Sequence, residues 1–213
     1  MEKVEAFTYL GSQITACGTV HGEVQRRIAK ATGVFQSLTT CLWKRREICI
    51  QVKLRVFASS VLAVLLYGAE TWNLMHHDIS LLRSFYMRCL KTILRVNPFL
   101  HHYKKSHDDV LKETNMPPIE DIIGRSRWRW LGHVLRMDDT RVPRKVVFSK
   151  RQGGRALGAP AKRWSDLVRQ DTRRWLPTSE NLVDAAMDRS RWRELAGKSL
   201  FGTPDDTQHM PTQ

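Results

Sequence analysis

The stretch Val56-Phe57-Ala58-Ser59-Ser60-Val61-Leu62-Ala63-Val64-Leu65-Leu66-Tyr67 is the longest apolar run of the 213-residue chain. A membrane-spanning helix needs about 20 predominantly apolar residues, so this shorter run predicts a buried helix instead. The helix extends from about Glu47 to Tyr67, beginning amphipathic with Val52 and Val56 and then becoming apolar all round. The sequence therefore predicts a mainly α fold with this helix near its centre.

Two amphipathic helices flank the central one in the sequence. The first, from about Glu23 to Thr40, has a single apolar stripe because its apolar residues recur at spacings of three and four. The second begins near Asp78, which suits an N-cap, and Asn97-Pro98 ends it. We expect residues 21–100 to form one helical bundle.

Residues 1–20 predict a short β-hairpin followed by a loop. Phe7–Leu10 is strand-like, Gly11-Ser12 can turn, and Gln13–Thr15 can return as a second strand. The expected fold class is therefore a helical bundle with a short N-terminal β-hairpin.

The C-terminal half predicts a second, small helical region over residues 101–196. Its helical patterns cover about Asp108–Thr114, Ile119–Met137, Ala161–Arg174 and Ser179–Ala196. Gly132 lies inside the second of these, where a missing side chain allows another backbone to approach closely. Residues 197–213 are rich in Gly, Pro, Thr and Gln, so we expect a disordered tail.

Positive charge is the most unusual property of the composition. The chain carries 35 Lys and Arg against 21 Asp and Glu, a net charge of +14, which favours a polyanionic partner. Residues 122–175 hold fifteen of these basic residues and only four acids, and Trp128, Trp130, Trp164 and Trp175 are interleaved with them. Trp130 and Trp164 fit apolar helical stripes, so we interpret both as core residues, and the arginines as a nucleic-acid-binding surface.

Membrane and secretory roles are not favoured. The first residues, Met1–Glu5, show no basic region followed by an apolar stretch, so we expect no signal peptide. Four cysteines (Cys17, Cys41, Cys49 and Cys89) are scattered through the first half, which suits reduced thiols better than a disulfide framework. We expect an intracellular protein, in the nucleus or the cytoplasm.

The carboxylate, histidine and cysteine residues of the sequence do not form a complete catalytic or metal-binding pattern. The pairs Asp108-Asp109, Asp138-Asp139 and Asp205-Asp206 lack the third carboxylate and rigid strand end that Mg²⁺-dependent phosphoryl transfer needs. His101, His102, His107 and Asp108, and Cys17 with His21, are only fragments of a structural zinc pattern. We therefore predict no catalytic residues, no metal site and no cofactor.

Four motifs, in order, resemble non-LTR (LINE-type) retrotransposon reverse transcriptases. Phe7–Ser12 (FTYLGS) is similar to the Phe-x-Tyr-Leu-Gly hairpin called the primer grip, and Leu65–Trp72 (LLYGAETW) is similar to the stretch that follows it. Arg88–Leu94 (RCLKTIL) and Arg127–Met137 (RWRWLGHVLRM) resemble the family's next helix and its Arg-x-Arg-Trp-x-Gly-His signature. The resemblance spans residues 7–175.

The resemblance implies the part of the polymerase from the primer grip through the thumb into the C-terminal region. The family's Tyr-x-Asp-Asp polymerase motif and its endonuclease are absent from this sequence, so RNA-directed DNA synthesis does not carry over to the chain alone. Residues 21–100 would be the thumb, with helix-borne Arg and Lys against the backbone of a primer–template duplex.

The implied partners are RNA, DNA or both. The predicted binding residues come from the hairpin, the first helix and the basic segment: Phe7, Tyr9, Leu10, Gly11, Arg26, Arg27, Lys30, Arg125, Arg127, Arg129, Arg136, Arg144, Lys145, Lys150, Arg151, Arg155, Lys162 and Arg163.

Three other interpretations stay open. The chain could act as part of a complete reverse transcriptase, either in an assembly or in a longer reading frame. Its basic face could instead bind an acidic protein. It could also be a non-functional relic, because the hairpin would present an unpaired edge without neighbouring strands.

Overall fold

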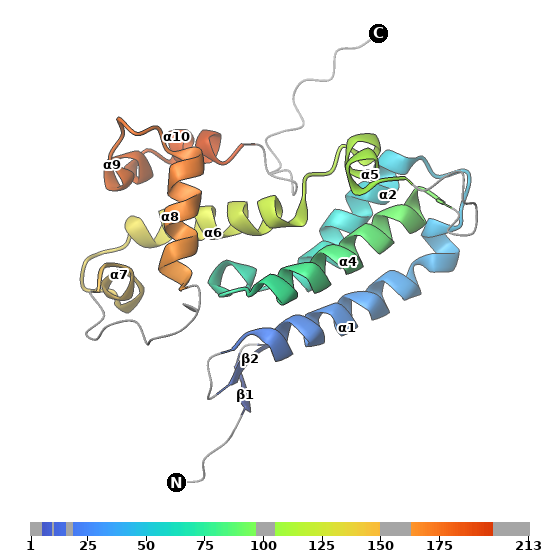
Figure 1. Cartoon of the computed structure of the whole chain (residues 1–213), viewed down its shortest axis with the longest axis horizontal. Helices are drawn as coiled ribbons and strands as arrows, with labels where there is room; N and C mark the ends of the chain where they lie inside the picture. Colours follow the sequence, from blue (N-terminus) through green and yellow to red (C-terminus); the bar gives the residue numbers. More distant parts are fainter. Residues whose placement is uncertain (1–5, 10, 16–18, 97–104, 150–162, 198–213) are drawn as a thin grey trace. The chain divides into compact units, whose positions relative to one another are not determined.

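The computed structural model describes residues 6–9, 11–15, 19–96, 105–149 and 163–197. The chain divides into two compact units, Met1–Ile122 and Ile123–Gln213 (Figure 1). The division falls within helix α6 (Ile119–Leu135). Each unit has its own buried core.

The fold is mainly helical, as the sequence predicted. The elements of unit 1 before α6 are β1 (Ala6–Tyr9), β2 (Ser12–Thr15), α1 (His21–Ser37), η1 (Thr39–Trp43), α2 (Ile50–Val56), η2 (Phe57–Leu62), α3 (Ala63–Leu65), η3 (Ala69–Thr71), α4 (His76–Ile93) and α5 (His107–Thr114). After α6, unit 2 continues with α7 (Val142–Phe148), α8 (Trp164–Trp175), α9 (Leu182–Met187) and α10 (Arg189–Leu195). None of the helices in the described part of the chain combines the length and apolar character that a bilayer crossing requires.

The predicted N-terminal hairpin is confirmed. Strands β1 and β2 pair antiparallel, with Phe7 opposite Ile14 and Tyr9 opposite Ser12. Gly11 has a φ of 81°, a conformation that glycine adopts without steric cost. The turn between the strands therefore depends on Gly11.

The apolar run at residues 56–67 forms the centre of unit 1. It belongs to one continuous helical stretch, α2–η2–α3, whose middle segment η2 is π-helical. Phe57, Val61, Leu62 and Leu65 are completely buried there, and α1 packs against both η2 and α3. The predicted central helix is thus present, although it begins at Ile50 and not near residue 47.

Helix α4 begins earlier than the sequence suggested. Met75 is its N-cap, and Asp78 occupies the third helical position, so the prediction of Asp78 as N-cap was wrong. One carboxylate oxygen of Asp78, Oδ2, accepts a hydrogen bond of 3.1 Å from the Met75 backbone N–H. An acid at this third position reaches back to the helix entrance, which explains why an acidic start signal was displaced by three residues. Asn97-Pro98, the predicted end, lies outside the described residues.

Stacked tryptophans organise the core of unit 2. The rings of Trp128 on α6 and Trp192 on α10 are parallel, with an interplanar angle of 1° and centroids 4.0 Å apart. The Trp192 indole Nε1 also donates a 3.0 Å hydrogen bond to the Trp128 carbonyl. Leu131, Leu135 and Ala186 complete this buried cluster.

Two features of unit 2 differ from the sequence prediction. The single helix expected over residues 179–196 is broken into α9 and α10, because the Asp188 carboxylate caps a new helix by accepting from the N–H groups of Ser190 and Arg191 at 2.9 and 3.0 Å. Helix α7 was not predicted. Its first turn contains Pro143, a residue that suits the start of a helix.

Gly132 permits the close tryptophan contact. A Cβ built on Gly132 would lie only 2.6 Å from Cε2 of the Trp192 indole. The predicted close approach is therefore real, but it is made by a side chain and not by a backbone.

The Gly132→Ala substitution should destabilise unit 2 by about 1–3 kcal/mol, because the added methyl overpacks against Trp192. Gly33→Ala is the matched control, since Gly33 also lies inside a helix but a Cβ there would meet nothing within 4 Å. That control should gain about 0.5–1 kcal/mol from the lower backbone entropy of alanine. Urea unfolding of both variants measures the difference, and equal effects would contradict the packing described here.

Candidate nucleic-acid interface

Arg127 joins two helices of unit 2 through a buried ion pair. Its guanidinium Nε lies 2.6 Å from Oδ2 of Asp171 on α8, and both side chains are about nine-tenths buried. A buried arginine paired in this way has little surface to offer a phosphate. We assign Arg127 a structural role and leave it out of the interface.

Gly124 allows α8 to lie close to α6 near the Arg127–Asp171 ion pair. A Cβ on Gly124 would lie 2.9 Å from the Trp175 ring and 3.4 Å from the Asp171 carboxylate. The sequence analysis did not single out Gly124 or Asp171. Both contacts link residues more than forty positions apart, so no local pattern points to them.

Arg27 holds the hairpin to helix α1. It is 5% exposed, its Nε donates to Glu23 at 2.6 Å, and its Nη2 donates to the Gly11 carbonyl at 2.7 Å. Its guanidinium also lies over the Tyr67 ring, 4.5 Å from the centroid. Arg27, like Arg127, is occupied by contacts within the protein.

Arg26 and Lys30 lie on the same helix with different surroundings. Arg26 donates to Glu23 at 2.7 Å and to the Gly11 carbonyl, with about a quarter of its side chain exposed. Lys30 is exposed one turn further along. In unit 1, Lys30 is therefore the predicted contact best placed to meet a phosphate.

The other predicted basic residues of unit 2 that the structure describes range from half-buried to exposed. Arg136 is half-buried and donates to the Ala186 carbonyl at 2.7 Å, while burial, and then the charge of Arg189, lower its pKa. Arg125 and Arg163 are also half-buried, and Arg144 pairs with Asp139. Arg129 and Lys145 are exposed.

Helix α8 adds basic residues that the sequence analysis did not select. Arg169 and Arg173 are exposed, four residues apart, and line a small open pocket together with Asp166 and Gln170. Positions four apart share one helix face, and Leu167 is buried on the opposite side. That spacing was visible in the sequence and could have identified both arginines.

The tryptophans of the basic segment pack against one another and do not present open faces. Trp130 and Trp164 are half-buried and meet edge to face with centroids 5.3 Å apart. Trp128 and Trp175 meet in the same way at 5.5 Å. These four rings are therefore engaged in contacts with other tryptophans.

Five predicted binding positions lie outside the described residues: Leu10, Lys150, Arg151, Arg155 and Lys162. The same holds for Cys17, His101 and His102. Of the hairpin residues, Phe7 is 60% exposed and Tyr9 belongs to β1.

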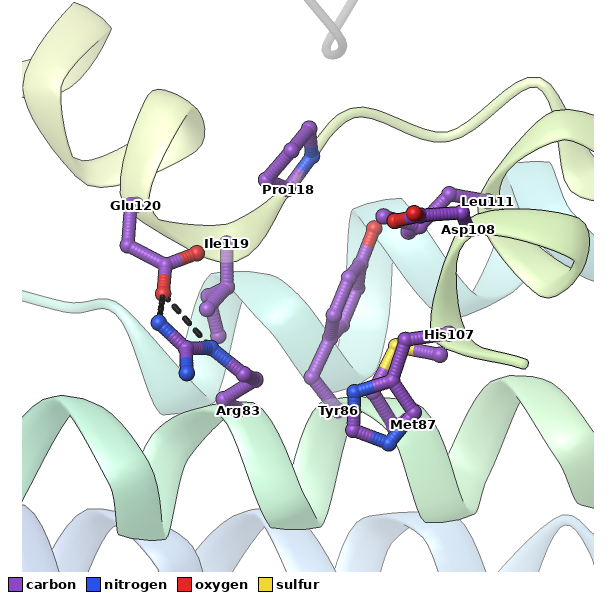
Figure 2. A pocket seen from close by; sticks show the side chains of 9 residues that line it. All are labelled: Arg83, Tyr86, Met87, His107, Asp108, Leu111, Pro118, Ile119 and Glu120. Carbon is purple, nitrogen blue, oxygen red and sulfur yellow. Dashed lines mark hydrogen bonds and ion pairs between the residues drawn. The ribbon is translucent and has the colours of Figure 1, made fainter.

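A pocket in unit 1 collects polar side chains from α4, α5 and the start of α6 (Figure 2). Arg83 donates to Glu120 through two nitrogens, and the Tyr86 hydroxyl donates to the Pro117 carbonyl at 2.9 Å. Burial, with a smaller effect of the Glu120 charge, raises the pKa of the Tyr86 phenol. Arg83, Glu120 and the Tyr86 hydroxyl thus form hydrogen bonds within the protein. The residues that line this pocket do not pair a nucleophile with a base.

Two of the Asp-Asp pairs have local structural roles. The Asp109 carboxylate accepts from the hydroxyl and the backbone N–H of Ser106, the N-cap of α5, and these hydrogen bonds lower the pKa of Asp109. Asp138 accepts from the Thr140 N–H at 2.8 Å, which lowers the pKa of Asp138. Both carboxylates therefore take part in hydrogen bonds that shape the local backbone.

The chain resembles one protein of transposon origin. It is 22% identical over 176 residues to a transposon-derived protein of Caenorhabditis elegans, a match that covers 80% of this chain and 61% of that protein. The chain thus spans less than two thirds of the length of this relative. No protein-family model matches the chain, and no solved structure matches it.

Arg127→Gln and Arg129→Gln should separate structural from exposed arginines, since each removes one positive charge from α6. Arg127→Gln removes the positive charge that faces the buried Asp171 carboxylate and should cost about 3–5 kcal/mol of unfolding free energy. Arg129→Gln should change stability by less than about 0.5 kcal/mol. Urea unfolding followed by tryptophan fluorescence measures both. Similar losses in the two variants would refute the structural role of Arg127.

Proposed function

We propose that the chain binds RNA or DNA through the exposed basic side chains of unit 2. The observation that carries this proposal is the imbalance of charge over residues 122–175, where fifteen Lys and Arg face four acids. All four acids have local partners. Asp171 is buried against Arg127, Asp139 pairs with Arg144, and Asp138 and Asp166 accept from nearby backbone N–H groups. The excess of positive charge is therefore not neutralised within the segment.

The proposed binding mode is phosphate contact without base readout. Arg129, Lys145, Arg169 and Arg173 are exposed and can neutralise phosphates and release counterions. Contacts of this kind position a nucleic acid but do not select its sequence. The packed tryptophans fit the same mode, because their faces are used within the protein.

We further propose that the chain corresponds to the part of a non-LTR retrotransposon reverse transcriptase from the primer grip through the thumb into the C-terminal region. It would lack the polymerase and endonuclease sites. Several residues of its family-like motifs are packing positions in this structure. Leu65, Leu66, Ala69 and Trp72 of the second motif are buried, and Gly132 of the fourth motif accommodates Trp192.

A second candidate is a role within a longer or assembled reverse transcriptase. Phe7 on β1 is 60% exposed, and β1 and β2 are the strands of the single sheet in the described residues. An exposed apolar side chain on a two-stranded sheet, whose strand edges can pair with further strands, favours contact with another part of a protein. The greater length of the Caenorhabditis elegans relative is in keeping with this candidate.

Binding should be measured by fluorescence anisotropy with labelled RNA, single-stranded DNA and an RNA–DNA hybrid over a salt series. We expect log affinity to fall linearly with log salt concentration. The Arg129→Glu/Arg169→Glu/Arg173→Glu protein should bind more weakly and lose about one unit of slope for each phosphate contact removed.

The matched control is Arg46→Glu/Arg55→Glu/Lys112→Glu, three exposed positions of unit 1 that change the net charge equally. It should bind much like the unsubstituted protein. Equal weakening by both triple variants would show that net charge and not this surface governs binding. Competition by polyglutamate, with no competition by RNA, would indicate an acidic protein partner and overturn the proposal.

A further inference from the structure

Two histidines and an aspartate converge where helix α1 meets helix α4. His21 is the first residue of α1, and His77 and Asp78 lie in the first turn of α4. His21 Nδ1 lies 2.7 Å from Asp78 Oδ1, His77 Nε2 lies 3.0 Å from the same oxygen, and the two nitrogens are 3.0 Å apart. The three atoms form a closed triangle of potential metal ligands.

Protons alone cannot satisfy this triangle. Each ring nitrogen carries at most one hydrogen and the ionised carboxylate carries none, so two hydrogens at most serve three close contacts. At least one edge is then left without a hydrogen bond between atoms in contact distance. A single cation facing the triangle would satisfy one lone pair from each of the three atoms.

Neighbouring groups already orient these ligand atoms. The other oxygen of Asp78, Oδ2, accepts from the Met75 N–H at 3.1 Å, which leaves Oδ1 for a ligand bond. His21 Nε2 lies 3.0 Å from the side-chain amide nitrogen of Gln25. With that amide turned so that its carbonyl oxygen faces the ring, Nε2 carries the ring hydrogen and donates it to Gln25, which leaves the Nδ1 lone pair for the ion. Second partners of this kind fix ring and carboxylate orientation in metal sites.

We propose that His21, His77 and Asp78 bind one divalent transition-metal ion of the zinc class. Imidazole nitrogen and carboxylate oxygen suit such ions, and tetrahedral zinc with bonds of about 2.0–2.1 Å holds its ligand atoms about 3.3 Å apart. The observed separations reach that value with shifts of a few tenths of an ångström. Asp78 is 99% buried, while the side chains of His21 and His77 are 39% and 58% exposed, so an ion can enter from solvent and keep water as a further ligand.

The ion would fasten the start of α1 to the start of α4. Both helix starts carry partial positive charge, which opposes a cation, and the ionised Asp78 carboxylate offsets that effect. Because α1 also holds the hairpin through Arg26 and Arg27, the site would stabilise the hairpin-bearing end of unit 1.

Isothermal titration calorimetry of the full chain, after dialysis against a chelator, tests the site with Zn²⁺ as the probe. We expect one equivalent to bind with a dissociation constant of about one micromolar or tighter. His77→Ala should weaken binding by about tenfold or more, since one of three ligands is lost. His76→Ala is the control, because His76 is also exposed in the first turn of α4 but is not part of the triangle.

Thermal unfolding provides a second readout that does not depend on the calorimeter. Zn²⁺ should raise the midpoint of the unsubstituted protein and of His76→Ala, but not that of His77→Ala, because only ligand that binds the folded state stabilises it. Circular dichroism confirms that His77→Ala folds. Failure of the unsubstituted protein to bind one equivalent, or equal weakening by His76→Ala and His77→Ala, would overturn the proposal.

Discussion

The stack of Trp128 on Trp192 is the constraint on which unit 2 depends. Parallel rings 4.0 Å apart bring α6 and α10 together, and the contact is available only because position 132 carries no side chain. An aromatic pair of this kind contributes about 0.5–1.5 kcal/mol beyond the area that it buries. Trp128 is turned inward, whereas its neighbour Arg129 is exposed on another face of α6.

The basic residues then divide into two groups with different roles. Arg27 and Arg127 are buried, each paired with an acid, and each joins segments that are distant in the sequence. Removing one partner of a buried ion pair lowers the free energy of unfolding by more than an exposed ion pair adds to it. Arg129 and Arg173 are exposed and belong to the surface that we propose for binding. Net charge alone could not have made this distinction.

Local patterns predicted the elements well, and long-range partners poorly. Helical spacing predicted α1, and the hairpin followed from Gly11, because both depend on residues a few positions apart. The Arg127–Asp171 pair and the convergence of His21 with His77 join residues 44 and 56 positions apart. One sequence carries no signal for such contacts. The exposed arginines of α8, Arg169 and Arg173, are a different case, because their spacing of four residues is a local pattern that the sequence shows.

Hydrogen–deuterium exchange of the full chain, with and without an RNA–DNA hybrid, tests the central claim most directly, because it locates binding without any substitution. The account predicts slower exchange in α8 and in the exposed face of α6, with little change in α2 and η2, whose backbone is already protected in the core of unit 1. Slower exchange confined to residues 19–96, or no change in either unit under conditions where binding is saturated, would contradict it.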